Sequence, residues 1–397
     1  MSERRSSSRS SASGRDKPSR AYGYVVSVIR GRRGIIPGII RAVLSAAAIL
    51  YVAGLKLYLF LYRIGLRRAT KLPCKVICVG NLTMGGTGKT PTTQTVCRLL
   101  MAQGKRVAII IRGYGGEHEH SCALVSDGNS VLMTARQAGD EAYLLARTLP
   151  GVPVAVGRDR IRTGRLICKT CSPDVIVMDD GFQHWRLHRD LNIVLLNACD
   201  PFDNGWTVPR GMLREPRTHL RRAGIVLLTN SLRAGDEKLA SLREEVARLA
   251  PNKPIFTGDL SPVALLDLSG NEVDELSWLD GRRVGAMCAL GNPASFESML
   301  ADLGAILAKR YRFRDHHDVT QREFERISWK SEQEGAQAVV TTEKDAVKMA
   351  SAKAELPLLV LRVAMQISDE SAFVAAIRAR LDPEVPDEHG GVKLTLT

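Results

Sequence analysis

Short apolar runs rich in β-branched residues alternate with amphipathic segments from Lys75 to Asn230. The runs are KVICVG, RVAIII, VPVAVG, DVIVMDD, LNIVLLNA and GIVLLTN. Helical patterns lie between them, one beginning at Lys89 and one spanning about Asp140–Leu149. Near-continuous β-branched runs of this length are typical of strands in a parallel sheet that helices cover on both faces. The sequence therefore predicts an α/β fold built on a doubly wound, mostly parallel sheet.

The same rhythm restarts after about Pro254. Three further runs, RRVGAMCALG, QAVVTTEKD and LPLLVLRV, read as strands, and a helix is expected at Pro293–Leu307. We therefore expect two domains after an N-terminal arm. The larger one is a core over residues 73–255, and the smaller one is an α/β domain over residues 256–397 whose tail after Asp382 looks loose.

Charge is distributed unevenly along the 397 residues, which carry a formal net charge of +14. Residues 1–72 hold 15 Lys and Arg side chains and 2 acidic ones, whereas the rest of the chain holds 41 and 40. A nearly neutral body gives no reason to expect nucleic acid as a partner. The basic arm instead indicates attraction to an anionic surface, most simply a phospholipid headgroup layer reached through residues 21–72. No obligate protein partner is evident from the sequence.

The arm has two parts. Residues 1–20 contain eight Ser and six basic residues and almost nothing apolar, so we expect disorder there. An apolar stretch then runs from Ile35 to Leu66 with Arg on both flanks, and its 21 residues from Ala42 to Tyr62 are just long enough to span hydrocarbon. The charge asymmetry that orients a span is missing. We favour a helix that lies in the membrane interface or inserts shallowly, with a full span and a core helix of the body as alternatives.

Eight cysteines are scattered along the chain without the spacing of a disulfide framework. Several lie inside apolar runs, so reduced thiols in a cytosolic compartment are the favoured interpretation. Cys168 and Cys171 form a lone C-x-x-C, and no second pair or His partner follows at the spacing of a zinc site.

A glycine-rich loop follows the first predicted strand. Val76–Val79 reads as that strand, the next residues read GNLTMGGTGKT, and a helical pattern then begins. Such a loop binds phosphate because its N–H groups and the helix N-terminus attract anions. Lys89 can reach the β- and γ-phosphates and the Thr90 hydroxyl can ligate Mg²⁺, although Thr83 stands where the usual pattern has its first Gly. We predict a P-loop NTPase-like fold whose ATP-binding residues are Gly85, Gly86, Thr87, Gly88, Lys89 and Thr90.

A second predicted strand ends in acid, reading Val175–Met178 and then Asp179 and Asp180. An acidic pair after a strand is by itself often a solvated turn. In P-loop proteins, however, a carboxylate at the carboxyl end of a neighbouring strand holds the Mg²⁺ shell. Ligands bind at that edge of such sheets. Together with the glycine-rich loop, the pair predicts a magnesium site formed by Thr90, Asp179 and Asp180.

Further polar groups stand at strand ends or in loops, where an α/β fold places its chemistry. Arg112 and Tyr114 follow RVAIII, and Arg214 follows LNIVLLNA after a loop. Asp140 begins an apolar helix, where it could serve only as an N-cap. Taken singly, each of these groups has a structural interpretation, as do the DHHD and TTEKD segments of the second unit.

Taken together, these segments are specific, because they resemble in order the motifs of the tetraacyldisaccharide 4′-kinase family of lipid A biosynthesis. The resemblance runs from about Val76 to Met349, and the basic apolar arm is similar to that family's membrane-associated N-terminus. The family's Thr or Ser at the first-Gly position also accounts for Thr83. The matching segments are GNLTxGGTGKTP, RGYG, GDE, DDGFQH, LREP, GNP, DHH and TEKD.

The resemblance implies transfer of the ATP γ-phosphate, with Mg²⁺, to the 4′-hydroxyl of a tetraacylated glucosamine disaccharide 1-phosphate. A lipid acceptor stays in its membrane, so the enzyme is expected at the cytoplasmic face of the inner membrane. Besides Lys89, the family's catalytic Asp matches Asp140, and its partner His, from the second domain, matches His316, with His317 as the alternative. Domain closure could complete that pair only when substrate is present. The residues implied on the acceptor side are Asn81, Arg112, Tyr114, Gln183, His184, Arg214 and Glu215.

Three other classes of protein share single features with this sequence. A membrane-bound switch ATPase of the partitioning or targeting type carries a Lys just before GGxGKT, where this chain has Met84. A metal-binding protein would need to use His118 with His120, His184 with His188, or the His316–His317 doublet, and none completes a ligand spacing. A structural membrane adaptor with an inactive nucleotide site is disfavoured because Lys89, Thr90 and the acid pair are all present.

Overall fold

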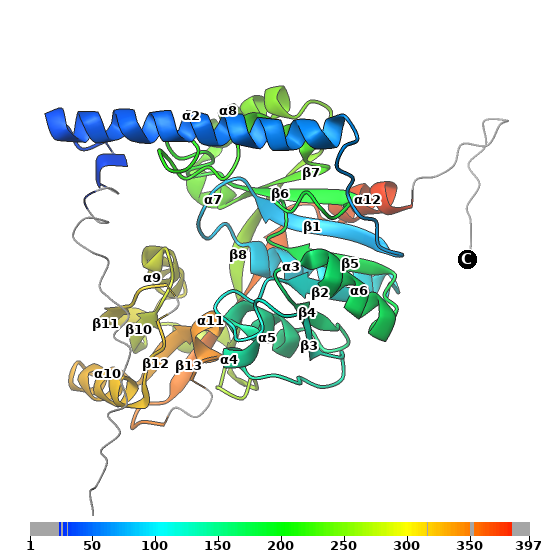
Figure 1. Cartoon of the computed structure of the whole chain (residues 1–397). Helices are drawn as coiled ribbons and strands as arrows, with labels where there is room; N and C mark the ends of the chain where they lie inside the picture. The colour runs from blue at the N-terminus through cyan, green and yellow to red at the C-terminus, as the bar shows by residue number, and fades with distance from the viewer. Residues whose placement is uncertain (1–23, 25–26, 30, 316, 350–352, 383–397) are drawn as a thin grey trace, which may run out of the picture.

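The computed structural model describes residues 24, 27–29, 31–315, 317–349 and 353–382. Within these residues, thirteen strands form one mixed, mostly parallel sheet (Figure 1) in the order β11-β10-β12-β13-β8-β7-β6-β1-β5-β2-β4-β3, with β9 paired to β8. The strands are β1 Lys75–Asn81, β2 Val107–Ile111, β3 Ala123–Ser126, β4 Val154–Val156, β5 Val175–Asp179, β6 Leu191–Asn197, β7 Ile225–Thr229, β8 Ile255–Leu266, β9 Glu272–Asp274, β10 Arg283–Cys288, β11 Ile306–Arg312, β12 Ala338–Thr342 and β13 Leu358–Ile367.

Helices cover both faces of this sheet. The described helices are α2 Ile35–Arg63, α3 Lys89–Ala102, α4 Ala135–Ala138, α5 Asp140–Thr148, α6 Arg160–Cys171, α7 Ser231–Ala234, α8 Asp236–Leu249, α9 Pro293–Asp302, α10 Gln321–Gln333, α11 Glu343–Ala346 and α12 Glu370–Leu381, with short 3₁₀ turns at η1 Arg217–Arg222 and η2 Leu276–Leu279. The expected disorder of residues 1–20, the tail after Asp382 and the candidate His316 lie outside the described residues.

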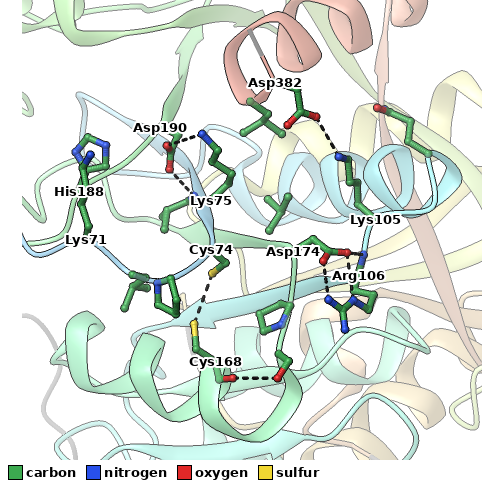
Figure 2. A pocket seen from close by; sticks show the side chains of 18 of the residues that line it. Lys71, Cys74, Lys75, Lys105, Arg106, Cys168, Asp174, His188, Asp190 and Asp382 are labelled. Carbon is green, nitrogen blue, oxygen red and sulfur yellow. Dashed lines mark hydrogen bonds and ion pairs between the residues drawn. The ribbon is translucent and has the colours of Figure 1, made fainter. Parts of the chain in front are cut away.

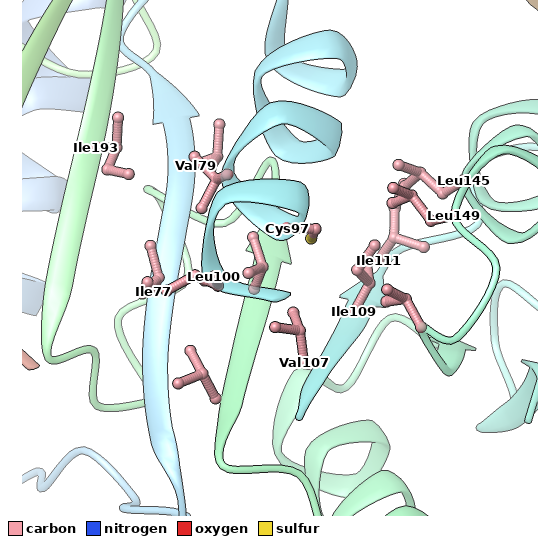
Figure 3. Packing of buried hydrophobic residues seen from close by; sticks show 14 of the residues in the cluster. Ile77, Val79, Cys97, Leu100, Val107, Ile109, Ile111, Leu145, Leu149 and Ile193 are labelled. Atoms are coloured by element: carbon pink, nitrogen blue, oxygen red, sulfur yellow. The ribbon is translucent and has the colours of Figure 1, made fainter. Parts of the chain in front are cut away.

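The first half of the sheet confirms the predicted doubly wound arrangement. Strands β7, β6, β1, β5, β2 and β4 are mutually parallel, and β3 adds an antiparallel edge. Alternate residues of β1 point to opposite faces. Ile77 and Val79 pack with α3, α5 and α12, as Figure 3 shows in part, whereas Val76 and Cys78 pack with α6 and α8. Burial on both faces explains why the run KVICVG is apolar without alternation.

Strand β8 continues the same sheet into the C-terminal part. Its first residues pair in parallel with β7, and from Gly258 to Leu266 it pairs antiparallel with β13. Strands β13, β12, β10 and β11 then continue in parallel. After β13 the chain returns to the first half, because Phe373 and Ile377 of α12 pack in the core of α3 and α5. The division of the chain at residues 255/256 stays a prediction.

One predicted helix was too long. The helix expected at Pro293–Leu307 is present as α9 but ends at Asp302. Gly304 has a positive φ of +82°, and a Cβ there would meet the Asp280 carboxylate, so the helix stops before it. Ile306 and Leu307 begin the edge strand β11, a strand that apolar patterning did not reveal.

The apolar stretch of the arm is one continuous helix, α2, which Figure 1 draws in blue along one side of the molecule. It is long and apolar enough to cross a membrane, and little of its most apolar part is buried in the protein. These properties suit a membrane-seated helix and do not suit a core helix of the body.

Candidate functional site

The glycine-rich loop joins β1 to α3, as the sequence predicted. Gly85 and Gly88 have φ values of +116° and +82°, a region that residues with a Cβ rarely adopt. At Gly88, a Cβ would also lie 2.9 Å from the Met365 Cε atom. Helix α3 begins at Lys89 with Gly88 as its N-cap and no side chain bonded to its first N–H groups. Those N–H groups are therefore available to an anion at the helix N-terminus.

Two polar side chains hold the base of this loop. The Asn81 amide donates to Thr87 Oγ1 at 2.9 Å, and the Gln183 amide donates to the Asn81 carbonyl at 2.9 Å. Asn81 is fully buried. Both residues were expected on the acceptor side, and the structure places Asn81 beneath the loop and Gln183 between the loop and the acid pair.

The acid pair ends β5, which lies directly beside β1 with Val79 paired to Asp179. The Thr90 hydroxyl donates to Asp179 Oδ2 at 3.4 Å. Asp179 is 1% exposed, and its Oδ1 atom has no hydrogen-bond partner among the described residues. Burial, with Glu141 and Asp180 nearby, raises the pKa of Asp179 to about 7, because each disfavours the charged carboxylate.

Asp180 is surrounded by positive charge. The Arg214 guanidinium donates to Asp180 Oδ1 at 2.8 Å, and the Lys89 ammonium lies 3.9 Å from the same atom. Burial alone would raise the pKa of Asp180, but Lys89 and Arg214 together hold it below its usual value. Asp180 is therefore ionised at neutral pH, next to Asp179, whose pKa is about 7.

This donor set fits a magnesium ion. A threonine hydroxyl and two carboxylates are hard oxygen ligands, and Mg²⁺ is usually held by one or two carboxylates together with phosphate oxygens. The orphaned buried Asp179 Oδ1 is an acceptor that a metal ion or a water of its shell would satisfy. Across the described part of the chain, no group of three or more His, Cys, Asp and Glu side chains could hold a metal ion.

Asp140 begins α5, where its N-cap is Gly139. Its Oδ2 atom lies 2.8 Å from the ammonium of Lys348, which also contacts Asp318 Oδ1 at 3.3 Å. Burial would lower the pKa of Lys348, but its bonds to Asp140 and Asp318 raise it, so the side chain is charged. Sequence reasoning missed Lys348. The available signal was its place one helical turn after Lys344 of the TEKD segment.

Arg112 and Tyr114 lie together after β2. The Arg112 guanidinium is 5.7 Å from the centre of the Tyr114 ring and donates to Glu119 Oε1 at 2.7 Å. The Tyr114 ring is exposed. The pair therefore presents a cation and an aromatic face at the surface. It lies after β2 and is not part of the glycine-rich loop between β1 and α3.

Glu215 and His184, also expected on the acceptor side, are largely buried. Glu215 accepts hydrogen bonds from the Trp185 indole at 3.1 Å and from His219 at 2.8 Å, and it pairs with Arg222. Burial, then Arg160, Arg189 and Arg186, lowers the pKa of His184 to about 4, so this imidazole is neutral at physiological pH.

A cavity of about 1020 Å³ lies at the other end of the parallel strands, where β1 and β5 begin (Figure 2). It is lined by the beginnings of β1 and β5 and the ends of α3, α6 and α12. Its charged side chains pair with one another, as in Lys75 with Asp190, Lys105 with Asp382 and Arg106 with Asp174. None of the candidate site residues lines it. The candidate active site therefore lies at the carboxyl ends of β1 and β5, next to the glycine-rich loop.

Comparison with known proteins identifies the family of this chain. The family model described as tetraacyldisaccharide-1-P 4′-kinase matches residues 40–382. The tetraacyldisaccharide 4′-kinase of Syntrophus aciditrophicus is 41% identical over 337 residues, which cover 83% of this chain and 90% of the relative. That of Pelobacter propionicus is 38% identical over 349 residues, covering 87% and 94%.

A solved structure is also similar along most of the chain. It is the crystal structure of the "apo" form of LpxK from Aquifex aeolicus in complex with ATP, with 32% sequence identity and a TM-score of 0.72. The match covers 86% of this chain and 99% of that one. The extent of these matches, together with a glycine-rich loop beside an acid pair, shows that the chain belongs to the tetraacyldisaccharide 4′-kinase family.

Proposed function

We propose that this protein transfers the γ-phosphate of ATP to the 4′-hydroxyl of a tetraacylated glucosamine disaccharide 1-phosphate. The observation that carries this proposal is the convergence of Lys89, Thr90, Asp179, Asp180 and Arg214 at the edge of the sheet where β1 and β5 end. Phosphoryl transfer needs mostly positioning and neutralisation of charge, and this group supplies both.

The glycine-rich loop and Lys89 bind the nucleotide in this proposal. The N–H groups of Gly85–Gly88 and of the first turn of α3 surround the β-phosphate, and the Lys89 ammonium reaches the β- and γ-phosphates. Thr90, Asp179 and Asp180 would hold Mg²⁺, which when bound neutralises charge on the phosphate oxygens. Arg214 keeps Asp180 in place through its 2.8 Å bond.

Asp140 accepts the proton of the attacking hydroxyl. The Lys348 ammonium lies 2.8 Å from Asp140 Oδ2, and this ion pair fixes the orientation of the carboxylate. His316 is proposed as its partner from the C-terminal part, in accordance with the family resemblance. The hydroxyl oxygen forms the new bond to phosphorus while the bond to the β-phosphate oxygen breaks, and ADP leaves.

On the acceptor side, we assign direct contact to Arg112, Tyr114, Gln183 and Arg214. An Arg fork suits a sugar phosphate, and an exposed aromatic ring suits a sugar face. Asn81 and Glu215 are buried, and His184 is half-buried. We therefore assign them to support of the loop and of the acceptor contacts.

The arm brings the enzyme to its substrate. Helix α2 exposes Ile39, Val43, Leu50 and Leu57, and basic residues flank it at Arg32 and Arg33 and at Arg67 and Arg68. This combination suits an anionic bilayer. We place the protein at the cytoplasmic face of the inner membrane, where ATP and the acylated acceptor meet.

The test is transfer of radiolabel from γ-labelled ATP to purified tetraacyldisaccharide 1-phosphate in mixed micelles with Mg²⁺. We expect label on the glycolipid, dependent on acceptor and absent with the Lys89→Ala variant. Hydrolysis of ATP at the same rate without glycolipid, with no label on it, would instead identify a switch ATPase and overturn the proposal.

A further inference from the structure

The middle of α2 contacts the active-site region through one side chain. The Tyr51 hydroxyl donates to the backbone carbonyl of Arg214 at 2.7 Å, across 163 positions of sequence. Ala48, three residues earlier on the same side of the helix, is 1% exposed. The helix therefore rests on the body at this turn, and the contact is specific because it joins a hydroxyl to one carbonyl.

The segment that receives this contact also forms the outer support of the phosphate loop. The Met84 N–H donates to the Met212 carbonyl at 2.7 Å, and the Arg214 N–H donates to the Leu82 carbonyl at 2.7 Å. Thr83 and Leu213 pair between them as an antiparallel bridge. Residues 212–214 thus act as a short added strand against residues 82–84, immediately before the glycines.

Arg214 contacts three elements with three different groups. Its carbonyl accepts from Tyr51 of α2, its N–H donates to the loop, and its guanidinium donates to Asp180 at 2.8 Å and to Gln183 Oε1 at 3.3 Å. A displacement of this backbone would move both the edge of the loop and the cation beside Asp180. Arg214 is therefore the point at which the position of α2 can be transmitted to the site.

Among the described residues, helix α2 also has a second face that is largely exposed. Leu50, next to Tyr51 in sequence, is 73% exposed, and Leu57 is 65% exposed. At this turn of the helix the Leu50 side chain is exposed, whereas the adjacent Tyr51, although 41% exposed, bonds to the Arg214 carbonyl. When a membrane binds the exposed face of α2, it also fixes the depth of the helix in the bilayer and its rotation about its own axis. Both determine where Tyr51 is placed.

We propose that Tyr51 is a positioning residue through which the membrane-seated helix α2 holds Arg214, and with it the phosphate loop, in the arrangement for transfer. The inference rests on the proposed kinase function and adds to it a dependence of catalysis on helix placement. Tyr51 touches neither nucleotide nor acceptor in this account. It acts on the reaction only through the backbone of residues 212–214.

Tyr51→Phe is the direct test because it removes the hydroxyl and keeps the ring. Tyr58→Phe is the matched control, since Tyr58 lies on the same helix and its hydroxyl bonds to the Tyr62 hydroxyl, at 3.0 Å, rather than to the active-site region. Each variant of the full chain is assayed with tetraacyldisaccharide 1-phosphate in phosphatidylglycerol vesicles. Sedimentation with the same vesicles measures membrane binding.

For Tyr51→Phe we expect kcat to fall about five-fold, the effect of losing one neutral hydrogen bond that acts in the transition state. Vesicle binding and KM for ATP should match those of Tyr58→Phe, whose kcat stays at the wild-type value. Arg214→Ala keeps the backbone carbonyl that Tyr51 bonds and removes only the guanidinium. In that background Tyr51→Phe should lower kcat by less than it does in the wild type, because the part of its effect that acts through the guanidinium is already lost.

Three results would overturn the proposal. They are an unchanged kcat in Tyr51→Phe, a loss of vesicle binding equal to the loss of kcat, or fully additive losses with Arg214→Ala. Failure of the wild-type protein to phosphorylate the glycolipid would instead overturn the proposed function itself. Active wild type with an equally active Tyr51→Phe variant overturns only the coupling.

Discussion

Lys348 and Asp140 form an ion pair of 2.8 Å that joins the C-terminal part of the chain to the first turn of α5. The Lys348 side chain is 8% exposed and also lies 3.3 Å from Asp318. The Lys348 ammonium thus bonds both to Asp318, from the C-terminal part of the chain, and to Asp140, the residue proposed to take the acceptor proton. Buried charges of this kind depend on their partners, because the desolvation cost remains when one partner is removed.

Replacing Lys348 with Met should therefore lower turnover strongly. The variant leaves the Asp140 carboxylate, whose side chain is 18% exposed, without this cation, and we expect kcat to fall by about ten-fold or more. Lys309→Met is the control, because Lys309 forms an exposed pair with Glu334 at 3.0 Å, and such pairs contribute little. Steady-state kinetics on both variants decides the matter, and a near-normal kcat in Lys348→Met would remove Lys348 from the site.

Asp140→Ala separates a catalytic role from a favourable charge interaction with the N-terminus of α5, whose N-cap is Gly139. We expect turnover to fall by about 100-fold or more while ATP affinity changes little, because the residue serves the acceptor proton. The chain provides a matched control in Asp236, which begins α8 after Gly235 and before a Glu, as Asp140 begins α5. Asp236→Ala loses only the favourable interaction with the helix N-terminus. Equal effects of the two variants on kcat would make Asp140 a structural residue.

Lys89→Ala and Asp180→Ala test the nucleotide site. Each removes a group proposed to contact phosphate or metal, so transfer should fall by about 100-fold or more in both. Lys75→Ala and Asp190→Ala are the controls, because they form an ion pair of 3.5 Å at the opposite end of the sheet. Initial rates at saturating ATP and acceptor provide the measurement. Substantial activity in either site variant contradicts the assigned role of that residue.

The pKa of Asp179, about 7 against an ordinary 3.8, predicts a pH-dependent stability. Between these two values the folded protein keeps a proton that the unfolded chain has released. This contribution to stability is therefore present at low pH and is lost as the pH rises through about 7. Asp179→Asn does not titrate, so its Tm minus that of the wild type should increase from about pH 5 to about pH 8 without Mg²⁺.

Thermal unfolding across this pH range measures the difference directly. A difference that stays constant would show that Asp179 titrates at its ordinary pKa. Mg²⁺ with ATP should stabilise the wild type more than the variant at the higher pH, because a metal ion binds the ionised carboxylate.

The parts of the site that sequence predicted share one physical cause. Lys89 and Thr90 follow a strand that is apolar on both faces, and Asp179 and Asp180 follow another. Because parallel strands bring their carboxyl ends to the same edge, two such motifs meet whenever the strands are neighbours. Patterning also found these strands, since burial on both faces leaves near-continuous apolar runs.

What sequence missed depends on contacts between distant segments. Strand β8 contains Gly258, Asp259 and Pro262, and edge strand β11 exposes Arg310 and Arg312, so neither presents a long apolar run. Lys348 meets Asp140 only after the C-terminal strands have joined the sheet. The burial of Glu215 likewise follows from the packing of Arg222 between the rings of Phe182 and Trp185, at 3.9 and 3.7 Å.

The last prediction concerns membrane binding by the exposed face of α2. Leu50 and Leu57 are 73% and 65% exposed, and in the proposed orientation both lie in the lipid interface. Replacing both with Glu removes apolar contact and adds negative charge toward anionic headgroups, so binding to phosphatidylglycerol vesicles should weaken by about ten-fold or more. Activity on vesicle-borne acceptor should fall in parallel, and activity on detergent-dispersed acceptor should fall less.

Leu232→Glu is the matched control, because Leu232 is 84% exposed but belongs to α7 and not to α2. It should leave vesicle binding unchanged. Sedimentation with vesicles at low and high salt measures both contributions, since salt screens the attraction of the basic flanks but not the burial of leucine. If the Leu50 and Leu57 double variant binds vesicles as the wild type does, α2 does not seat this face in lipid, and the basic flanks alone would have to hold the protein at the bilayer.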